Sequence, residues 1–229
     1  MHAYVDTGAG MAEDGWSAAW TFDLDRWGSC GQGPGDAAAL ADLARQCGLR
    51  PGDLDVVERV TRAATGDETV FARDREPATA AERETTLAIL SMVRERTLDL
   101  VLRTPDADLD RRDPARRLPS WASWYSAREL AWHIADTESR YYLPVLGLPA
   151  RPRAADLVTE LVESAAHVRA AVAAMPPSLR TVSDRHGEWT TVKVLRRLAW
   201  HERGELAVLE RLVAGDAGPD ADDPVESPG

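Results

Sequence analysis

The sequence predicts a mainly α-helical protein in which a four-helix bundle follows a small α+β domain. Within the C-terminal two thirds, four long stretches each place their apolar residues on one face of a helix. Nearer the N-terminus, short apolar runs alternate with glycine-rich turns, which is typical of strands. We therefore expect an α+β module over 1–75, a bundle over 76–214 and a disordered acidic tail over 215–229.

The N-terminal module is expected to contain four strands and one helix in the order β-β-α-β-β. Strands are predicted at 2–6, 16–24, 55–61 and 69–72, and an alanine- and leucine-rich helix at 36–46. The glycine-dense run at 28–35 is expected to turn, and Gly48 is expected to stop the helix. No catalytic combination of residues is evident in this module.

Capping residues and prolines bound the four predicted helices of the bundle. These helices are expected at 79–103, at 126–142, at 153–175, and from Thr190 or Thr191 to about residue 212. Ser126 and Glu129 form a capping-box pattern at the start of the second helix. The intervening loops contain prolines, which cannot continue a helix.

Composition narrows the partners and the compartment. The net charge of -11 argues against nucleic acid and against an anionic membrane surface as partners. No run of about 18 apolar residues predicts a transmembrane helix, and the N-terminal residues lack a signal-peptide pattern. Cys30 and Cys47 are the only cysteines, so a reducing cytoplasm is the expected compartment. A homodimer is left open.

The last predicted helix carries a carboxylate within its apolar face. At about 100° per residue, Glu205 falls near the middle of a face formed by Leu195, Leu198, Leu209 and Leu212. His201 lies one turn earlier, at the edge of that face. A carboxylate in an apolar seam is costly unless it is paired or binds a metal. Glu205 is therefore expected to bind a metal or to pair with an arginine such as Arg128 or Arg196.

His201 and Glu205 are four residues apart, which places an imidazole and a carboxylate on one helix face. A metal bound there needs a third ligand from a facing helix, and His133 is the best candidate. His133 also has an ordinary interpretation as a core histidine bonded to a carbonyl. The segment 201–205 resembles H-E-x-x-H with its last histidine replaced, which would make Glu202 the general base beside a metal-bound water.

Two segments resemble the DinB/YfiT superfamily of metalloenzymes. They read W-Y-S-A-R-E-L-A-W-H-I-A-D-T-E-S-R-Y-Y from residue 124 and G-E-W-T-T-V-K-V-L-R-R-L-A-W-H-E-R-G-E-L from residue 187. The resemblance implies a bundle with up-down-down-up connectivity and a divalent metal bound by His133, His201 and position 205. The family's usual histidine is Glu205 here, and the thiol-dependent maleylpyruvate isomerase branch uses a mixed His/Glu set. The N-terminal part is similar to the small HicB-like domain that sometimes precedes such bundles.

The resemblance also implies a metal-dependent enzyme that acts on a small molecule. Characterised relatives include transferases and isomerases that use low-molecular-weight thiols such as mycothiol, and some hydrolases. Zinc is the expected metal, with nickel or iron as alternatives. Asp136 and Glu138 are expected to orient His133, and Tyr141, Trp124 and Trp200 are expected to line the pocket.

Two other functions remain open. In the first, the protein is a metal-dependent hydrolase with Glu202 as the base. In the second, it is a non-catalytic binding or scaffold protein that has lost the metal, and Glu205 is neutralised by an arginine.

Overall fold

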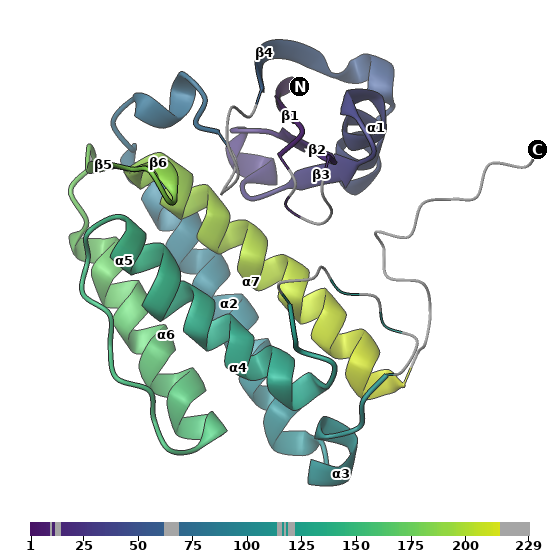
Figure 1. Cartoon of the computed structure of the whole chain (residues 1–229), viewed down its shortest axis with the longest axis vertical. Helices are drawn as coiled ribbons and strands as arrows, with labels where there is room; N and C mark the ends of the chain where they lie inside the picture. Colours follow the sequence, from purple (N-terminus) through teal and green to yellow (C-terminus); the bar gives the residue numbers. More distant parts are fainter. Residues whose placement is uncertain are drawn as a thin grey trace, which may run out of the picture.

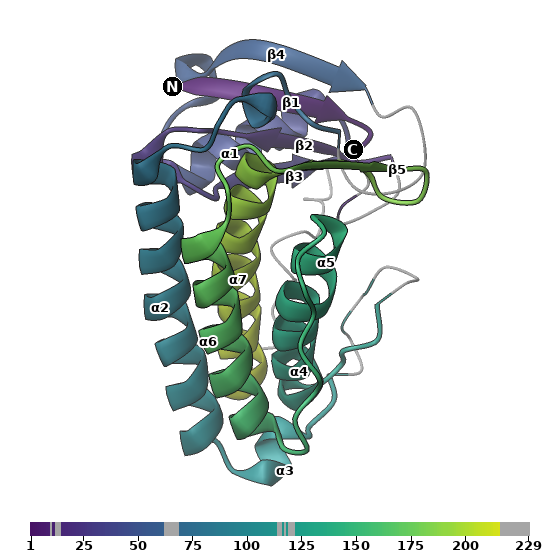
Figure 2. The ribbon, with the colours of Figure 1, turned by 90° about the vertical axis from the view of Figure 1, so that its left-hand side faces the viewer.

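The computed structural model describes residues 1–9, 11, 15–61, 69–113, 116, 118 and 122–215. Helices make up about 55% of the chain, and a small four-stranded sheet lies near the N-terminus. The sheet module sits at one end of a set of long helices, which run side by side beneath it (Figures 1 and 2). The predicted mainly helical character, with a small strand-containing part before the helices, is therefore confirmed. All but Gly215 of the predicted disordered tail lies outside the described residues.

The N-terminal sheet has the strand order β3-β2-β1-β4. Its strands are β1 (His2–Thr7), β2 (Ser17–Trp20), β3 (Cys30–Gly33) and β4 (Asp55–Thr61). β1 pairs antiparallel with β2 and parallel with β4, and helix α1 (Asp36–Gln46) connects β3 to β4. α1 covers one face of the sheet, where an apolar cluster includes Ala3, Val5, Ala19, Ala39 and Leu43.

The predicted turn at 28–35 is wrong in part, because it contains strand β3. Its glycines serve close packing rather than chain reversal alone. A Cβ on Gly31 would lie 2.2 Å from the carbonyl oxygen of Ala39, so only glycine lets β3 pass this close to α1. The prediction for 36–46 is confirmed, and the second predicted strand is shorter than expected, at Ser17–Trp20.

The strand predicted at 69–72 is also wrong. The amide of Phe71 donates to the carboxylate of Asp74 at 3.0 Å, and the amide of Ala72 donates to the carboxylate of Glu58. Side chains therefore take the amide hydrogens that a sheet ladder would need. A single 3-10 turn follows at Arg73–Arg75, and two others lie at Leu24–Arg26 and Pro51–Asp53.

The helical part contains four long helices and several short elements. The long ones are α2 (Ala80–Arg103), α4 (Ala127–Thr137), α6 (Leu157–Ala174) and α7 (Thr191–Ala214). α3 (Asp106–Leu109) follows α2, and α4 continues into a π-helical segment (Glu138–Tyr142) and then α5 (Leu143–Val145). A hairpin of β5 (Arg180–Ser183) and β6 (Gly187–Thr190), which the sequence did not predict, precedes α7.

Capping residues explain where the long helices begin. Thr79 and Ser126 each form a capping box, at the starts of α2 and α4, and the capping box predicted at Ser126 is confirmed. Thr190 caps α7, whereas Asp156 caps α6, so that α6 begins at Leu157 and not at residue 153. Helical turns also continue past the predicted end at residue 142, because Pro144 lies in the first turn of α5, where its missing amide hydrogen is tolerated.

The four long helices enclose a mixed interior. α7 contacts α2 and α4, and α6 contacts the same two helices from the other side. One apolar cluster, around Leu143, Val168 and Leu195, lies towards the sheet. A second, around Leu130, Leu161 and Leu209, lies towards the opposite end. Several charged or titratable side chains are also buried within these helices, among them Arg94, Glu138, His201 and Glu202.

Buried polar contacts attach the N-terminal part to the long helices. The carboxylate of Asp74 pairs with the guanidinium of Arg196 on α7, with both side chains fully buried and Nε 2.9 Å from Oδ1. The indole of Trp27 donates a 2.8 Å hydrogen bond to the hydroxyl of Thr86 on α2. Within the described ranges, none of the helices combines the length and apolar content needed to cross a membrane.

Candidate metal centre

Three side chains from two helices meet between α4 and α7. They are His133 of α4 and His201 and Glu205 of α7, and their ligand atoms all lie within 4.8 Å of one another. The two Nε2 atoms are 3.3 Å apart, and each lies 3.8 Å from Oε1 of Glu205. Two atoms bound at about 2.0–2.1 Å to one tetrahedral zinc lie about 3.3 Å apart, so the residues present fit a single divalent ion.

The arrangement of these residues on α7 differs from the prediction in one respect. The helical periodicity of the sequence places Glu205 centrally and His201 at the edge, but the structure reverses this order. The side chain of His201 is 3% exposed, whereas that of Glu205 is 18% exposed. The reason is that α7 is contacted by both α2 and α4, so its buried arc is wider than the leucine stripe.

Both histidines are held in the neutral form. Burial, together with the positive charges of Arg197 and Arg94, lowers the pKa of His201 to about 3. Burial, together with His201 and the positive charge of Arg116, lowers the pKa of His133 to about 2. A neutral imidazole keeps the lone pair that metal binding requires. Near neutral pH, neither ring needs to lose a proton from a charged form before it binds a cation.

Other side chains orient the two imidazoles. Nδ1 of His201 lies 3.3 Å from Oε1 of Glu138, and Nδ1 of His133 lies 3.1 Å from the hydroxyl of Thr137. The indole of Trp124 stacks on the ring of His133, with centroids 3.5 Å apart and an interplanar angle of 14°. These contacts leave the two Nε2 atoms facing each other, and neighbours of this kind are typical of metal-binding histidines.

A buried charge cluster lies next to His201. Arg94 of α2 donates to Glu202 at 2.6 Å and to Glu138 at 2.7 Å, and all three side chains are 1% exposed. Burial raises the pKa of Glu202 to about 8 and that of Glu138 to about 7, and the charge of Arg94 opposes both shifts. Burial therefore favours a proton on this pair, whereas the charge-assisted hydrogen bond from Arg94 favours a carboxylate at Glu138.

Glu202 does not lie with the three candidate ligands. One residue along a helix turns the side chain by about 100°, which directs Glu202 towards Arg94 and away from the ring of His201. Its 1% exposure and its contact with Arg94 do not suit a general base that acts on a metal-bound water. The contact with Arg94 gives Glu202 a structural role, and the general-base role stays a prediction that this geometry does not favour.

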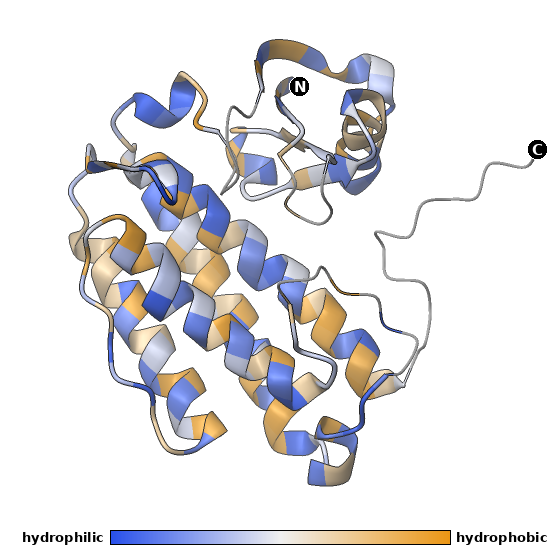
Figure 3. Cartoon of the chain, in the orientation of Figure 1, coloured by the Kyte–Doolittle hydropathy of each residue, from blue (hydrophilic) through white to orange (hydrophobic). Residues whose placement is uncertain are grey.

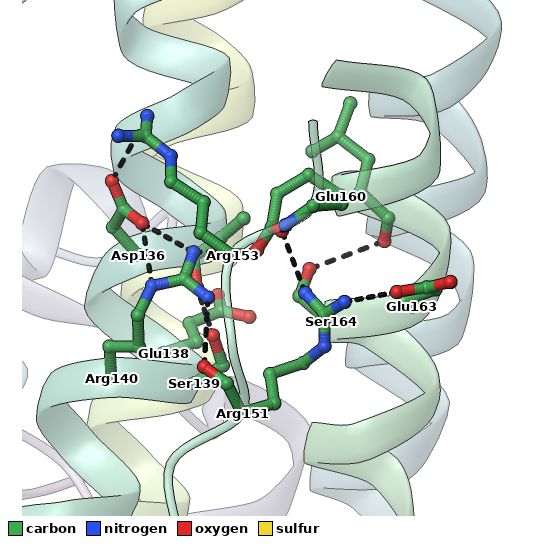
Figure 4. A network of polar contacts seen from close by, with 12 residues as sticks. Asp136, Glu138, Ser139, Arg140, Arg151, Arg153, Glu160, Glu163 and Ser164 are labelled. Atoms are coloured by element: carbon green, nitrogen blue, oxygen red, sulfur yellow. Dashed lines mark hydrogen bonds and ion pairs between the residues drawn. The ribbon is translucent and has the colours of Figure 1, made fainter. Parts of the chain in front are cut away.

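Asp136 belongs to an ion-pair network that joins α4 to α6 and to the segment before α6 (Figure 4). It pairs with Arg140 and Arg153, and Arg140 also pairs with the fully buried Glu160. The prediction that Asp136 and Glu138 orient His133 therefore differs from the structure, in which Glu138 contacts His201 instead. The side chain that orients His133 is Thr137, which sequence reasoning did not single out.

Trp200 and Tyr141 were also predicted to lie near the metal, and only Trp200 borders the candidate site. Trp200 packs edge-on against Trp20 of the sheet, and its ring lies 6.4 Å from that of His201. The hydroxyl of Tyr141 instead lies 3.3 Å from Nδ1 of His186, in the β5–β6 hairpin. Its neighbour Tyr142 takes the position beside His201, with centroids 5.6 Å apart.

Arg94 is the main residue that sequence reasoning missed. It lies on the same helical face as Leu90, Thr97 and Val101, all of them buried. Colouring by hydropathy shows the same mixture of polar and apolar residues along the long helices (Figure 3). A charged residue on an apolar face is the signal that drew attention to Glu205, and it was available here too.

The arginines proposed as partners of Glu205 pair with other carboxylates. Arg196 pairs with Asp74, and Arg128 pairs with Asp106 and Asp110.

Comparisons of the chain with family models, with curated proteins and with solved structures find no match.

Proposed function

We propose that this protein is a metal-dependent enzyme of the DinB-like type, in which His133, His201 and Glu205 bind one divalent metal inside a four-helix bundle. The observation that carries the proposal is the convergence of these three side chains from α4 and α7, with ligand atoms within 4.8 Å of one another. The cyclic contacts of α2, α7, α4 and α6 support the bundle arrangement.

The donor set favours zinc, with iron or nickel as alternatives. Two neutral imidazoles and one carboxylate form a common ligand set for catalytic zinc, and they also suit iron(II) sites with open positions. Both rings are neutral near pH 7, since the pKa values of His133 and His201 lie at about 2 and about 3. Binding therefore needs no deprotonation of an imidazolium ion.

The proposed substrate is a small molecule, with a low-molecular-weight thiol of the mycothiol type as the cosubstrate. When bound, the metal would supply Lewis-acid chemistry, which favours a thiolate over a thiol or polarises a substrate oxygen. The chain's own contribution is to hold the two imidazoles in place through Glu138 and Thr137. Thiol transfer or isomerisation fits this site better than hydrolysis with Glu202 as the base, because Glu202 is bonded to Arg94.

Metal titration of the protein, purified without a histidine tag, tests the proposal. We expect one zinc ion per chain, and a large loss of affinity in His133→Ala, His201→Ala and Glu205→Ala. His167→Ala is the matched control, because that histidine bonds to the carbonyl of Pro149 away from the candidate site. A wild-type protein that binds no zinc, iron or nickel would overturn the metal site and favour a non-catalytic binding protein.

A further inference from the structure

The carboxylate of Glu138 joins a fixed arginine to one of the candidate metal ligands. Its Oε2 accepts a 2.7 Å hydrogen bond from Nη2 of Arg94, and its Oε1 lies 3.3 Å from Nδ1 of His201. All three side chains are 3% exposed or less, so water does not compete for these contacts. Glu138 therefore contacts the imidazole from the side opposite to Nε2, the atom that faces His133.

Arg94 is fixed in turn by the helices around it. Its Nη1 donates to the carbonyl oxygen of Leu161 at 3.1 Å and to the hydroxyl of Ser164 at 3.0 Å, both on α6. Its remaining donors reach Glu138 beyond α4 and Glu202 on α7. A guanidinium bonded to three neighbouring helices cannot turn without breaking several hydrogen bonds. Glu138 thus has a rigid support.

The backbone changes form at Glu138. α4 is α-helical up to Thr137, and the π-helical segment begins with Glu138 itself. Single π-helical turns inside α-helices are rare, and those that occur often lie at functional sites. Here the wider turn accompanies the burial of both Glu138 and Tyr142, the two side chains of this segment that contact His201.

The position of Glu138 decides which nitrogen of His201 carries the hydrogen. A neutral imidazole has one N–H and one lone pair, and a carboxylate can only accept. The N–H therefore lies on Nδ1, where it donates to Glu138, and the lone pair lies on Nε2. Nε2 is the atom 3.3 Å from His133 and 3.8 Å from Glu205, where the metal is proposed.

We propose that Glu138, held in place by Arg94, is a positioning residue that fixes His201 in the Nδ1–H tautomer and thereby sets the metal affinity of the site. This inference rests on the proposed metal site. It means that tight metal binding requires Glu138 in addition to the three ligands. The carboxylate is needed for its acceptor capacity, and not only for its shape or for the burial of its stem.

Glu138→Gln tests this requirement because it keeps the shape and removes one acceptor. The amide has one oxygen but faces two donors, Arg94 and His201. Arg94 is always charged and can only donate, so the amide oxygen turns towards it and the amide nitrogen turns towards Nδ1. The hydrogen of His201 then moves to Nε2, which blocks the metal-binding lone pair.

Two measurements follow, and only one of them needs a metal. In metal-free protein, nitrogen NMR of the imidazoles is expected to show Nδ1–H for His201 in the wild type and Nε2–H in Glu138→Gln. In zinc titrations, Glu138→Gln is expected to bind about 10–100-fold more weakly than the wild type. Glu160→Gln is the matched control, because it removes another fully buried, arginine-paired carboxylate, and zinc affinity should stay within about twofold.

The outcomes separate this inference from the proposed function. If the wild type binds no metal, the proposed function fails and the inference falls with it. If the wild type binds zinc but Glu138→Gln binds it equally well, or keeps the Nδ1–H tautomer, the metal site stands and the role of Glu138 is overturned. Equal losses in Glu138→Gln and Glu160→Gln would also overturn it, since any buried carboxylate would then have the same effect.

Discussion

The indole of Trp124 lies flat on the imidazole of His133, with ring centroids 3.5 Å apart. Trp124 precedes the capping residue of α4, so the segment that leads into the helix also covers the candidate ligand that this helix carries. Burial is the largest cause of the low pKa of His133. The stacked indole contributes to that burial, and its removal should expose the ring.

Trp124→Leu should therefore raise the pKa of His133 from about 2 towards the ordinary histidine value of 6.5. In metal-free wild type we expect no titration of His133 above about pH 4, and in the variant a titration between about pH 4 and 6.5. NMR of the histidine ring protons measures this. Trp132→Leu is the control, because that ring stacks on Arg153. A His133 pKa unchanged by Trp124→Leu would show that the indole does not shield the ring.

Arg94→Met should destabilise the protein by about 3–5 kcal/mol, because it leaves the carboxyl groups of Glu138 and Glu202 buried without their cation. Urea denaturation measures the loss. Adding Glu138→Gln and Glu202→Gln to Arg94→Met should restore part of it, since amides are cheaper to bury. Arg96→Met, which removes an exposed ion pair between α2 and Glu210 of α7, should cost about 1 kcal/mol or less. Equal costs for the two arginines would contradict the assigned role of the buried cluster.

Glu202 should make the metal-free protein less stable as pH rises. Its folded pKa is raised to about 8 from the ordinary glutamate value of 4.5, so between these values the folded state holds a proton that the unfolded state has released. The stabilisation is complete below about pH 4.5 and is lost as pH rises through about 8, with a slope of up to about 1.4 kcal/mol per pH unit. Glu138 contributes a slope of the same sign and the two histidines one of the opposite sign, so the effect of Glu202 is the difference between the wild type and Glu202→Gln. In urea denaturation from pH 5 to 8, the advantage of the wild type over the variant should fall by up to this slope as pH rises. A variant with the same pH profile as the wild type would show that Glu202 is ionised when folded.

Gly28→Ala should loosen the contact between the N-terminal module and α7. Gly28 has a φ of +80°, and a Cβ there would lie 2.8 Å from the backbone nitrogen of Trp200. Gly48 has a φ of +69° and open space around the position a Cβ would take, so Gly48→Ala introduces backbone strain alone, about 1–2 kcal/mol. We expect Gly28→Ala to cost about 1–3 kcal/mol more than Gly48→Ala in thermal or urea unfolding. Equal losses of stability in Gly28→Ala and Gly48→Ala would mean that the N-terminal module moves enough to accommodate the added methyl group at this contact.

The helices could be predicted well because their signals are local. Thr79 and Ser126 cap the helices that the sequence assigned to them, and the spacing of His201 and Glu205 placed both on one face. The choice of His133 as the third ligand candidate also agrees with the structure. It depended on a histidine beside the apolar face of a second helix, which is a pattern readable without coordinates.

What the sequence did not reveal depends on contacts between distant segments. Strand β3 was missed because its glycines look like a turn until α1 is packed against them. Tyr142, and not Tyr141, lies beside His201, because the chain is π-helical over Glu138–Tyr142. A change of helix type leaves no periodic pattern in the sequence, so this difference could not be predicted. Glu202 was assigned to catalysis because Arg94, about a hundred residues away, could not be placed beside it.

The most direct test of the proposed metal site is a crystal structure of the zinc-soaked protein with anomalous scattering recorded across the zinc edge. We predict one strong peak within bonding distance of Nε2 of His133, Nε2 of His201 and a carboxylate oxygen of Glu205. The absence of a peak there, with a guanidinium bonded to Glu205 in its place, would contradict the metal site.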